Sequence, residues 1–449
     1  MNRAFADPKP DLIIKGGMVV TMVEDEQPMT DCDVYVAEGR IIRIGTSDPS
    51  VRDGDDAPEI IDARDALVMP GLINGHTHAA MTLFRGLADD LPLKQWLFEK
   101  IFPVEAKFLN PETVYWGSLL GCLEMIASGT TCFIDGYFFQ DGTVRAAHQA
   151  GLRGLIAQGI IDFPAPGVPE PKQNVNVATE FVEKWLGFSD LLMPGVFCHS
   201  PFTCSERTLR AAWELSRHFN LPLQIHLSET SEEVKAIREK VGKPPVHYLR
   251  DIGLIQEGLI AAHAVHIDPQ EINLLRAGDV KIVHAPESNM KLSSGVAAVS
   301  HMVKMGLVVG LGTDGCSSNN NLDLFGEMDT AAKLSKVFAL DPVALDAKTV
   351  VKMATRWGAA VLGLEKEIGT IEIGKKADMI VVDLKSPHLC PLYDPFSAIV
   401  YAADGADVKD VVVDGKILMK NRKFTTLDPV EIMENVRRIS EEIRVWALG

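Results

Sequence analysis

The fold of this chain is decided by the stretch Gly71-Leu72-Ile73-Asn74-Gly75-His76-Thr77-His78, which directly follows the apolar run Ala66-Leu67-Val68-Met69. Side chains two residues apart on a β-strand point to the same face. His76 and His78 can therefore reach one point together, and imidazole is the most common metal-binding side chain. An isolated histidine pair is more often an ordinary surface feature, so a metal site requires further ligands from elsewhere in the chain.

Outward from this stretch, apolar runs rich in β-branched residues alternate with helical patterns, which is typical of a parallel β/α array. Capping residues predict helices from Asn110 to near Gly129 and from Ser205 to Phe219. We therefore predict an α/β fold, a TIM-like (β/α)8 barrel. Its eight predicted strands are the runs 67–75, 131–137, 154–161, 193–199, 221–227, 259–266, 280–285 and 307–314.

Both ends of the chain read instead as short strands joined by tight turns. Gly16-Gly17, Glu38-Gly39 and Asp414-Gly415 each separate two apolar runs, and each predicts a hairpin. These features predict a small β-sandwich domain composed of residues 1–66 and 374–425, with the barrel at 67–373 between them.

The last segment, residues 426–449, carries apolar residues at helical spacing. We expect an amphipathic helix here that packs on the body of the protein through Ile432, Val436, Ile439 and Ile443.

The composition limits the classes of partner. A chain of 449 residues with 47% hydrophobic content can bury a large core, and no apolar run is long enough to span a membrane. The net charge of −17 repels nucleic acid and anionic lipid, so we expect neither as a partner and favour a small-molecule substrate. Seven scattered cysteines indicate free thiols and a cytoplasmic location. A homo-oligomer remains open.

Polar groups gather at the carboxyl ends of the predicted strands, where barrel enzymes carry their catalytic residues. Of the 12 histidines in the chain, most fall there. This inventory fits a hydrolase with one metal ion, held by nitrogen ligands from His76, His78 and His226 and an oxygen ligand from Asp314. Such an ion lowers the pKa of water, and Asp314 can accept the released proton. A lysine at the end of strand four could bridge two metal ions. That position holds Cys198-His199-Ser200 instead, so we expect one ion.

Glu229 lies three residues after His226, close enough to act as a general acid–base, and His263 can orient the attacking hydroxide or the leaving group. Each residue alone has a simpler interpretation. His226 fits a buried core histidine, Asp314 a turn residue, and Glu229 a helix cap. Their joint placement around one ring of strand ends favours the catalytic interpretation.

These motifs resemble the amidohydrolase superfamily over nearly the whole chain: Met69 to His78, His226-Leu227-Ser228-Glu229, His263 and Thr313-Asp314-Gly315. The resemblance implies one Zn²⁺ per subunit, or another divalent ion such as Fe²⁺. The glutamate three residues after His226 resembles the aminohydrolase branch, which deaminates ring amines.

Further stretches resemble the 5′-methylthioadenosine/S-adenosylhomocysteine deaminases: Met81 to Gly86, Pro103-Val104-Glu105, His199-Ser200-Pro201 and Ser288 to Gly295. The resemblance implies conversion of an adenosine-type amine to the inosine analogue with release of ammonia. It also implies that Glu105 binds the ribose diol, that His199 lies near the ribose or purine, and that Trp96 walls the pocket.

One departure bears on the substrate. A homocysteine tail carries a carboxylate, for which arginine is the expected partner. The segment from Asp162 to Asn176 contains no arginine, and its only basic residue is Lys172. Methylthioadenosine or adenosine therefore fits better than S-adenosylhomocysteine. The alternatives are an s-triazine chlorohydrolase, a deaminase of guanine or another free base, and a non-catalytic metal-binding barrel.

Overall fold

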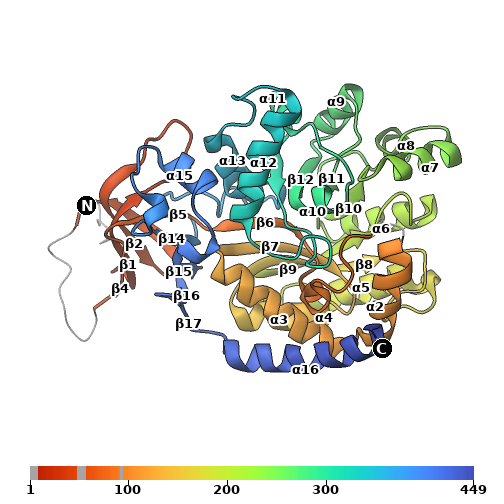
Figure 1. The fold of residues 1–449 in the computed structure, drawn as a ribbon, viewed down its shortest axis with the longest axis horizontal. Helices are drawn as coiled ribbons and strands as arrows, with labels where there is room; N and C mark the ends of the chain where they lie inside the picture. The colour runs from red at the N-terminus through yellow and green to blue at the C-terminus, as the bar shows by residue number, and fades with distance from the viewer. Residues whose placement is uncertain (1–8, 48–56, 92–94, 449) are drawn as a thin grey trace, which may run out of the picture.

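The computed structural model describes residues 9–47, 57–91 and 95–448. Its centre is a parallel sheet of eight strands in sequence order, surrounded by helices (Figure 1). Thr77 forms a parallel bridge to Asp314, which brings the end of the last strand against the first. The predicted barrel is thus confirmed. Its strands are β6 (Leu72–Thr77), β7 (Thr130–Tyr137), β8 (Arg153–Ile160), β9 (Leu192–Cys198), β10 (Leu223–Leu227), β11 (Leu259–His263), β12 (Lys281–His284) and β13 (Val309–Leu311).

The barrel strands are apolar because both of their faces are covered. Every residue of β7 and β8 is buried, as expected for a parallel sheet enclosed by helices. One end of the barrel interior is filled by an apolar cluster that α14 (Arg356–Val361) joins through Ala359 and Val361. The strand residues of this cluster are Ile73, Cys132, Ile134, Leu155, Ile260 and Val283.

The predicted helix starts coincide with side-chain caps. Asn110 accepts from the backbone N–H groups of Glu112 and Thr113 at the start of α3 (Pro111–Ala127), and Ser205 caps α6 (Glu206–His218). Both predicted helices are confirmed. The other helices of the barrel region are α4 (Asp141–Ala150), η3 (Pro171–Gln173), α5 (Asn174–Trp185), α7 (Ser231–Val241), α8 (Pro245–Asp251), α9 (Pro269–Ala277), α10 (Pro286–Lys291), α11 (Val299–Lys304), α12 (Leu324–Ala339) and α13 (Ala347–Ala354).

The run 67–75, predicted as one barrel strand, is two strands. β5 (Ala66–Pro70) pairs with β1 (Leu12–Val19) and β14 (Met379–Asp383) in the terminal sheet, whereas β6 opens the barrel. Gly71 separates them, and a Cβ at this position would lie 2.1 Å from Thr131 Oγ1. The prediction was wrong because both strands are fully buried, so no polar residue marks the junction.

The two ends of the chain form one mostly antiparallel sheet of nine strands, in the order β17-β16-β15-β14-β5-β1-β2-β3 with β4 beside β1. The predicted β-sandwich is thus a single continuous sheet. Side chains from both ends of the chain share one apolar cluster, which forms the core of this sheet. Its remaining strands are β2 (Met29–Ala37), β3 (Arg40–Gly45), β4 (Glu59–Asp62), β15 (Val408–Val413), β16 (Lys416–Lys420) and β17 (Lys423–Phe424). Residues 1–8 and 48–56 of the predicted domain lie outside the described residues.

Two of the three predicted hairpins are present, at Glu38-Gly39 between β2 and β3 and at Asp414-Gly415 between β15 and β16. The hairpin predicted at Gly16-Gly17 is wrong. β1 continues through both glycines, and its register against β2 shifts there. Gly16 has a φ of 76° and donates its N–H to Asp33 Oδ1 at 2.9 Å, so the glycine pair forms a bulge instead of a turn.

The helix α16 (Pro429–Leu448) runs beneath α3 in Figure 1, and buried Val436, Ile439 and Ile443 pack there beside residues of η1 (Ala79–Phe84) and α2 (Phe102–Phe108). We propose a composite sheet domain, a barrel and this helix as the organisation of the chain. In the described ranges, no helix combines the length and apolar character needed to cross a membrane. The remaining helices are η2 (Trp96–Ile101), η4 (Pro387–Leu389), α15 (Pro395–Tyr401) and η5 (Gly405–Asp407).

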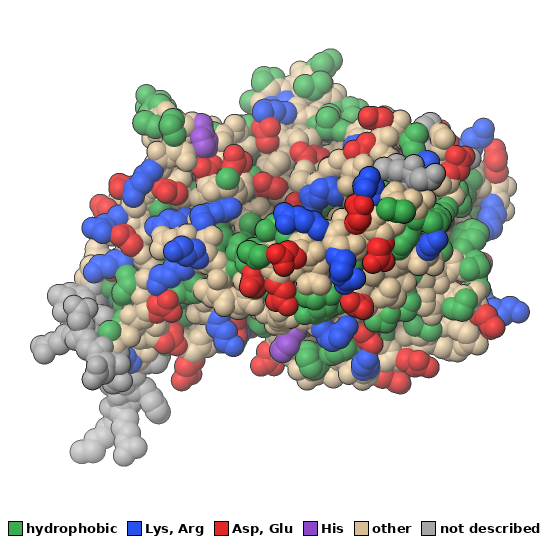
Figure 2. Space-filling model, turned by 60° about the horizontal axis from the view of Figure 1, so that its bottom comes forward, with side chains coloured by type: hydrophobic (Ala, Val, Ile, Leu, Met, Phe, Trp, Pro, Cys, Tyr) green, Lys and Arg blue, Asp and Glu red, His purple; other side chains and the backbone are tan. Residues whose placement is uncertain are grey.

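The surface carries both signs of charge. Figure 2 shows one face of the molecule on which acidic and basic side chains are interspersed.

Candidate metal centre and active site

Four potential metal ligands meet where the barrel strands end. His76, His226 and His263 belong to β6, β10 and β11, and Asp314 follows β13. Each offers one nitrogen or carboxylate oxygen, and these four atoms all lie within 4.8 Å of one another. The side chains of β6 and β10 are fully buried up to this point, so the strands hold the ligands on a rigid frame.

The nitrogen lone pairs of two histidines face this centre. His76 Nδ1 lies 3.0 Å from Gln224 Oε1, and His78 Nδ1 is directed at the carbonyl oxygen of Gly136. Since both acceptors are oxygens, each Nδ1 carries the proton of the neutral ring, whose Nε2 is then free to bind a cation. A protonated ring instead donates from Nε2. These Nε2 atoms lie 3.4 and 3.2 Å from Asp314 Oδ1. A divalent cation fits this donor set.

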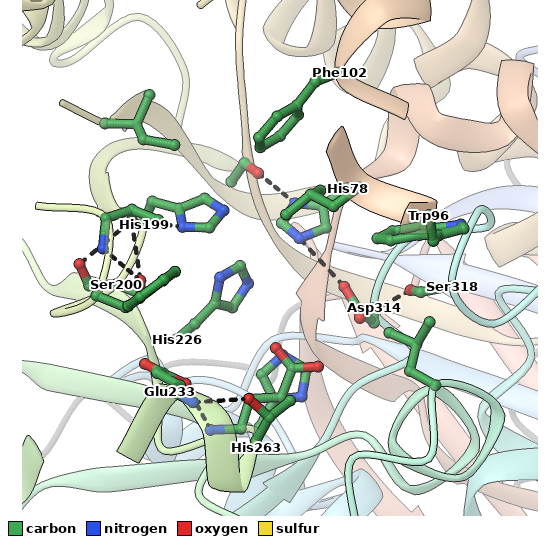
Figure 3. Close-up of a pocket in the computed structure, with 18 of the residues that line it drawn as sticks. His78, Trp96, Phe102, His199, Ser200, His226, Glu233, His263, Asp314 and Ser318 are labelled. Carbon is green, nitrogen blue, oxygen red and sulfur yellow. Dashed lines mark hydrogen bonds and ion pairs between the residues drawn. The ribbon is translucent and has the colours of Figure 1, made fainter. Parts of the chain in front are cut away.

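The observed cluster differs in one member from the predicted ligand set. His263 completes the compact group of four, in which His78 does not appear. His78 nevertheless directs Nε2 at the same Asp314 oxygen, as Figure 3 shows. Five side chains therefore surround the centre, and His263 could bind a cation there or a molecule held beside it.

The carboxylate of Asp314 is ionised and fixed. Ser288 Oγ and Ser318 Oγ donate to its Oδ2 at 2.7 and 2.9 Å, which leaves Oδ1 facing the histidines. Burial alone would raise its pKa, but His76 and His78 hold the pKa well below its usual range. Burial, with the neighbouring histidines, also lowers the pKa of His226 well below its usual value, so this ring is neutral and able to bind a metal.

Glu229 lies beside this cluster. Its Oε1 accepts from Ser294 Oγ at 3.1 Å, and its Oε2 is 3.9 Å from His263 Nε2. His263 Nδ1 donates to Asn289 Oδ1 at 2.9 Å, which turns Nε2 toward the centre. The carboxylate and the imidazole are thus placed to share protons with a molecule bound between them.

A second acidic group stands across the cavity. Glu105 on α2 is only 3% exposed, and Tyr137 donates its hydroxyl to Glu105 Oε1. Burial raises the pKa of Glu105 to about 7, against the opposing effect of the Tyr137 hydrogen bond. From the sequence, Glu105 is expected here only through the family resemblance. Tyr137 was not predicted as a site residue, although it is the last residue of β7 and a search of polar residues at strand ends could have found it.

All predicted site residues except His76 line one cavity of about 530 Å³, a volume suited to a nucleoside. Trp96 forms part of its wall and is 7% exposed. His199 Nδ1 lies 2.9 Å from Thr203 Oγ1, and burial lowers the pKa of His199 to about 3. The neutral imidazole can therefore hydrogen-bond a ligand without adding charge.

Glu233 was also missed. It lies in the first turn of α7 and accepts from the backbone N–H of Glu229 at 3.0 Å through Oε2. Its other oxygen is buried with no hydrogen-bond partner among the described residues. Burial raises the pKa of Glu233 to about 8, so it is largely protonated at neutral pH. Glutamates follow this strand at positions 229, 232 and 233, and the sequence does not reveal which of them is buried.

A parallel eight-stranded barrel with histidines and an aspartate at its strand ends defines a barrel protein with a divalent-metal centre. The sequence model of the amidohydrolase family matches residues 67–418 of this chain. The chain belongs to the amidohydrolase family.

Relatives of known name cover nearly all of this chain. It is 47% identical over 434 residues to the 5-methylthioadenosine/S-adenosylhomocysteine deaminase 1 of Syntrophus aciditrophicus, covering 97% of this chain and 98% of the relative. It is 45% identical over 434 residues to a 5′-deoxyadenosine deaminase of Methanosarcina acetivorans, covering 96% and 98%. The crystal structure of a zinc-bound adenosine deaminase from Xanthomonas campestris superposes with a TM-score of 0.93 at 37% identity, covering 97% and 99%.

Proposed function

We propose that this protein is a metal-dependent aminohydrolase, which converts an adenosine-type nucleoside to its inosine analogue and ammonia. One observation carries the proposal. The metal-binding cluster and Glu229 share a single cavity with the buried Glu105–Tyr137 pair. One end of the cavity can thus activate water and move protons, while the other can bind a sugar diol. The names of the relatives support the same reaction.

The cation would be held by His76, His78, His226 and Asp314, with His263 close by. We propose zinc, as in the related adenosine deaminase structure. When bound, a divalent cation supplies Lewis acidity, which allows water to ionise near neutral pH. The seven cysteines of the chain are all free thiols, which supports a reducing, cytoplasmic location.

The side chains around the cavity divide the proton transfers among them. Glu229 donates a proton to the ring nitrogen beside the amine-bearing carbon, because its carboxyl group faces the cavity next to the cluster. That proton comes from the attacking water, and the ionised Asp314 accepts the second water proton as the carbonyl forms and passes it to the departing amine. His263 Nε2, directed inward by Asn289, hydrogen-bonds the new oxygen.

Substrate orientation comes from the opposite wall. Tyr137 occupies Oε1 of Glu105, which leaves Oε2 to accept from the ribose hydroxyls. His199 offers a neutral ring to the nucleoside, and Trp96 shields the reacting centre from water. A free base or an s-triazine has no diol and would gain nothing from Glu105.

A substrate screen with a matched variant tests this proposal. Metal-loaded protein is assayed for ammonia from adenosine, methylthioadenosine, S-adenosylhomocysteine, guanine and an s-triazine. We expect release from the nucleosides, and a loss of at least ten-fold in kcat/KM on Glu105→Ala. Turnover of guanine or a triazine that Glu105→Ala does not change would support those alternatives. Protein that binds metal but turns over none of these compounds would support the alternative of a non-catalytic metal-binding barrel.

A further inference from the structure

We propose that the mouth of the cavity selects adenosines with an uncharged, apolar 5′ substituent and discriminates against a 5′ group that carries a carboxylate. The inference rests on the proposed deaminase function and names the substrate class within it. The relatives' names span methylthioadenosine, S-adenosylhomocysteine and 5′-deoxyadenosine, which differ at the 5′ position alone.

The outer part of the cavity is aromatic. Phe98, Phe163 and Phe202 line it and are 50%, 46% and 44% exposed, whereas the groups at its base are buried. They come from η2 and from the loops that follow β8 and β9. Deeper rings of Phe102 and Phe138 continue this surface inward. Large apolar side chains left half exposed around one opening form a surface suited to an apolar ligand group.

The charged groups among the described lining residues are acidic. Within the described residues, the wall contains no lysine or arginine. Lys172, the basic residue of the segment after β8, is exposed on η3 and does not line the cavity. A carboxylate that enters meets repulsion, and none of the described lining side chains offers a guanidinium or ammonium to bind it. The acidic side chains that line the cavity are Glu105, Glu229, Glu232, Glu233 and Asp314, and of these Glu233 is largely protonated at neutral pH.

The position of the 5′ group follows from the two ends of the site. The amine-bearing ring carbon must lie between Glu229 and the metal-binding cluster at the base. The ribose diol meets Glu105, which stands on α2 directly after η2. The 5′ carbon is attached to the ribose on the side away from the base of the cavity, so its substituent extends toward Phe98, Phe163 and Phe202. An alkylthio group gains apolar contact there. A homocysteine tail brings a carboxylate and an ammonium into an aromatic opening, where both charges lose water and no described lining cation pairs with the carboxylate.

Three thioethers separate length from charge in the experiment. The kcat/KM of the metal-loaded protein is measured for 5′-methylthioadenosine, 5′-butylthioadenosine and S-adenosylhomocysteine. We expect the butyl compound to remain within about three-fold of the methyl compound, and the homocysteine compound to fall at least ten-fold below the butyl compound. Binding of all three to metal-loaded Glu229→Gln is measured by titration calorimetry, and we expect the same order.

Two arginine variants provide the gain-of-function test. Phe163→Arg adds a guanidinium at the mouth and should raise kcat/KM for S-adenosylhomocysteine at least ten-fold relative to butylthioadenosine. Phe188→Arg makes the same change at a side chain that is also 46% exposed but does not line the cavity, and should leave the ratio unaltered.

Equal use and equal binding of S-adenosylhomocysteine and butylthioadenosine would overturn the inference. Absence of ammonia from every nucleoside would instead refute the proposed function, and the order of binding affinities would still decide the selectivity.

Discussion

Tyr137→Phe removes the hydroxyl that donates to Glu105 and keeps the aromatic ring in place. Because Glu105 is 3% exposed, solvent replaces the lost donor poorly. A hydrogen bond to a charged group contributes about 1.5–3 kcal/mol. At about 1.4 kcal/mol per decade, this corresponds to a roughly 10- to 100-fold fall in kcat/KM for a nucleoside.

The same substitution changes the charge of Glu105. Burial already raises its pKa to about 7, and the Tyr137 hydrogen bond opposes this rise. Without the hydroxyl the pKa rises further, and more of the carboxyl group is protonated at neutral pH. A protonated carboxyl accepts hydrogen bonds more weakly, so the deficit of the variant should shrink as the pH is raised from 7 to 9.

Deamination is followed by the ultraviolet change from the adenine to the hypoxanthine ring, with adenosine and 2′,3′-dideoxyadenosine as substrates. The dideoxy compound has no diol, so it should be insensitive to Tyr137→Phe. Tyr115→Phe is the matched control, because this tyrosine donates to Gln149 outside the cavity. Equal losses on both substrates, or no loss on adenosine, would refute the assignment of the Glu105–Tyr137 pair to the ribose.

Three further outcomes are expected. Burial raises the pKa of Glu233 from 4.5 to about 8, so the folded state binds more protons between these values and stability falls as the pH rises through this window. Glu233→Gln should flatten that part of the Tm profile. Arg153→Met strands the Asp378 side chain, 2% exposed and held at 2.7 and 3.1 Å. It should lower the free energy of unfolding by about 3–5 kcal/mol in denaturant titrations, and a loss below about 1 kcal/mol would contradict this assignment. His226→Ala should reduce bound metal far below one ion per chain by elemental analysis, and full occupancy would argue against it as a ligand.

The sequence predicted the barrel because its strands are buried on both faces and appear as separate apolar runs between helices. It misplaced the first strand, since β5 and β6 are both fully buried and Gly71 alone divides them. The prediction of a hairpin turn at Gly16-Gly17 was wrong for a related reason. Glycine permits a bulge as readily as a turn, and only pairing with β2 decides between them.

The candidate site could be found from residues that end strands, because the barrel brings those ends to one face. This rule found His226, His263 and Asp314 without knowledge of any contact. It could not separate His78 from His263 in the compact cluster, because that depends on side-chain directions set by Gly136 and Asn289. Glu105 stands on a helix outside the strand ends, and only the resemblance pointed to it.

In the proposed reaction, Glu229 moves a proton to the substrate ring. Bound metal and ammonia release are measured in the same samples of the wild-type chain and of Glu229→Gln, with methylthioadenosine as substrate. Since a positioned acid–base contributes about 10²- to 10⁴-fold, we predict that the variant keeps its metal and loses at least 100-fold in kcat. Wild-type turnover by the metal-loaded variant would show that Glu229 does not carry this proton.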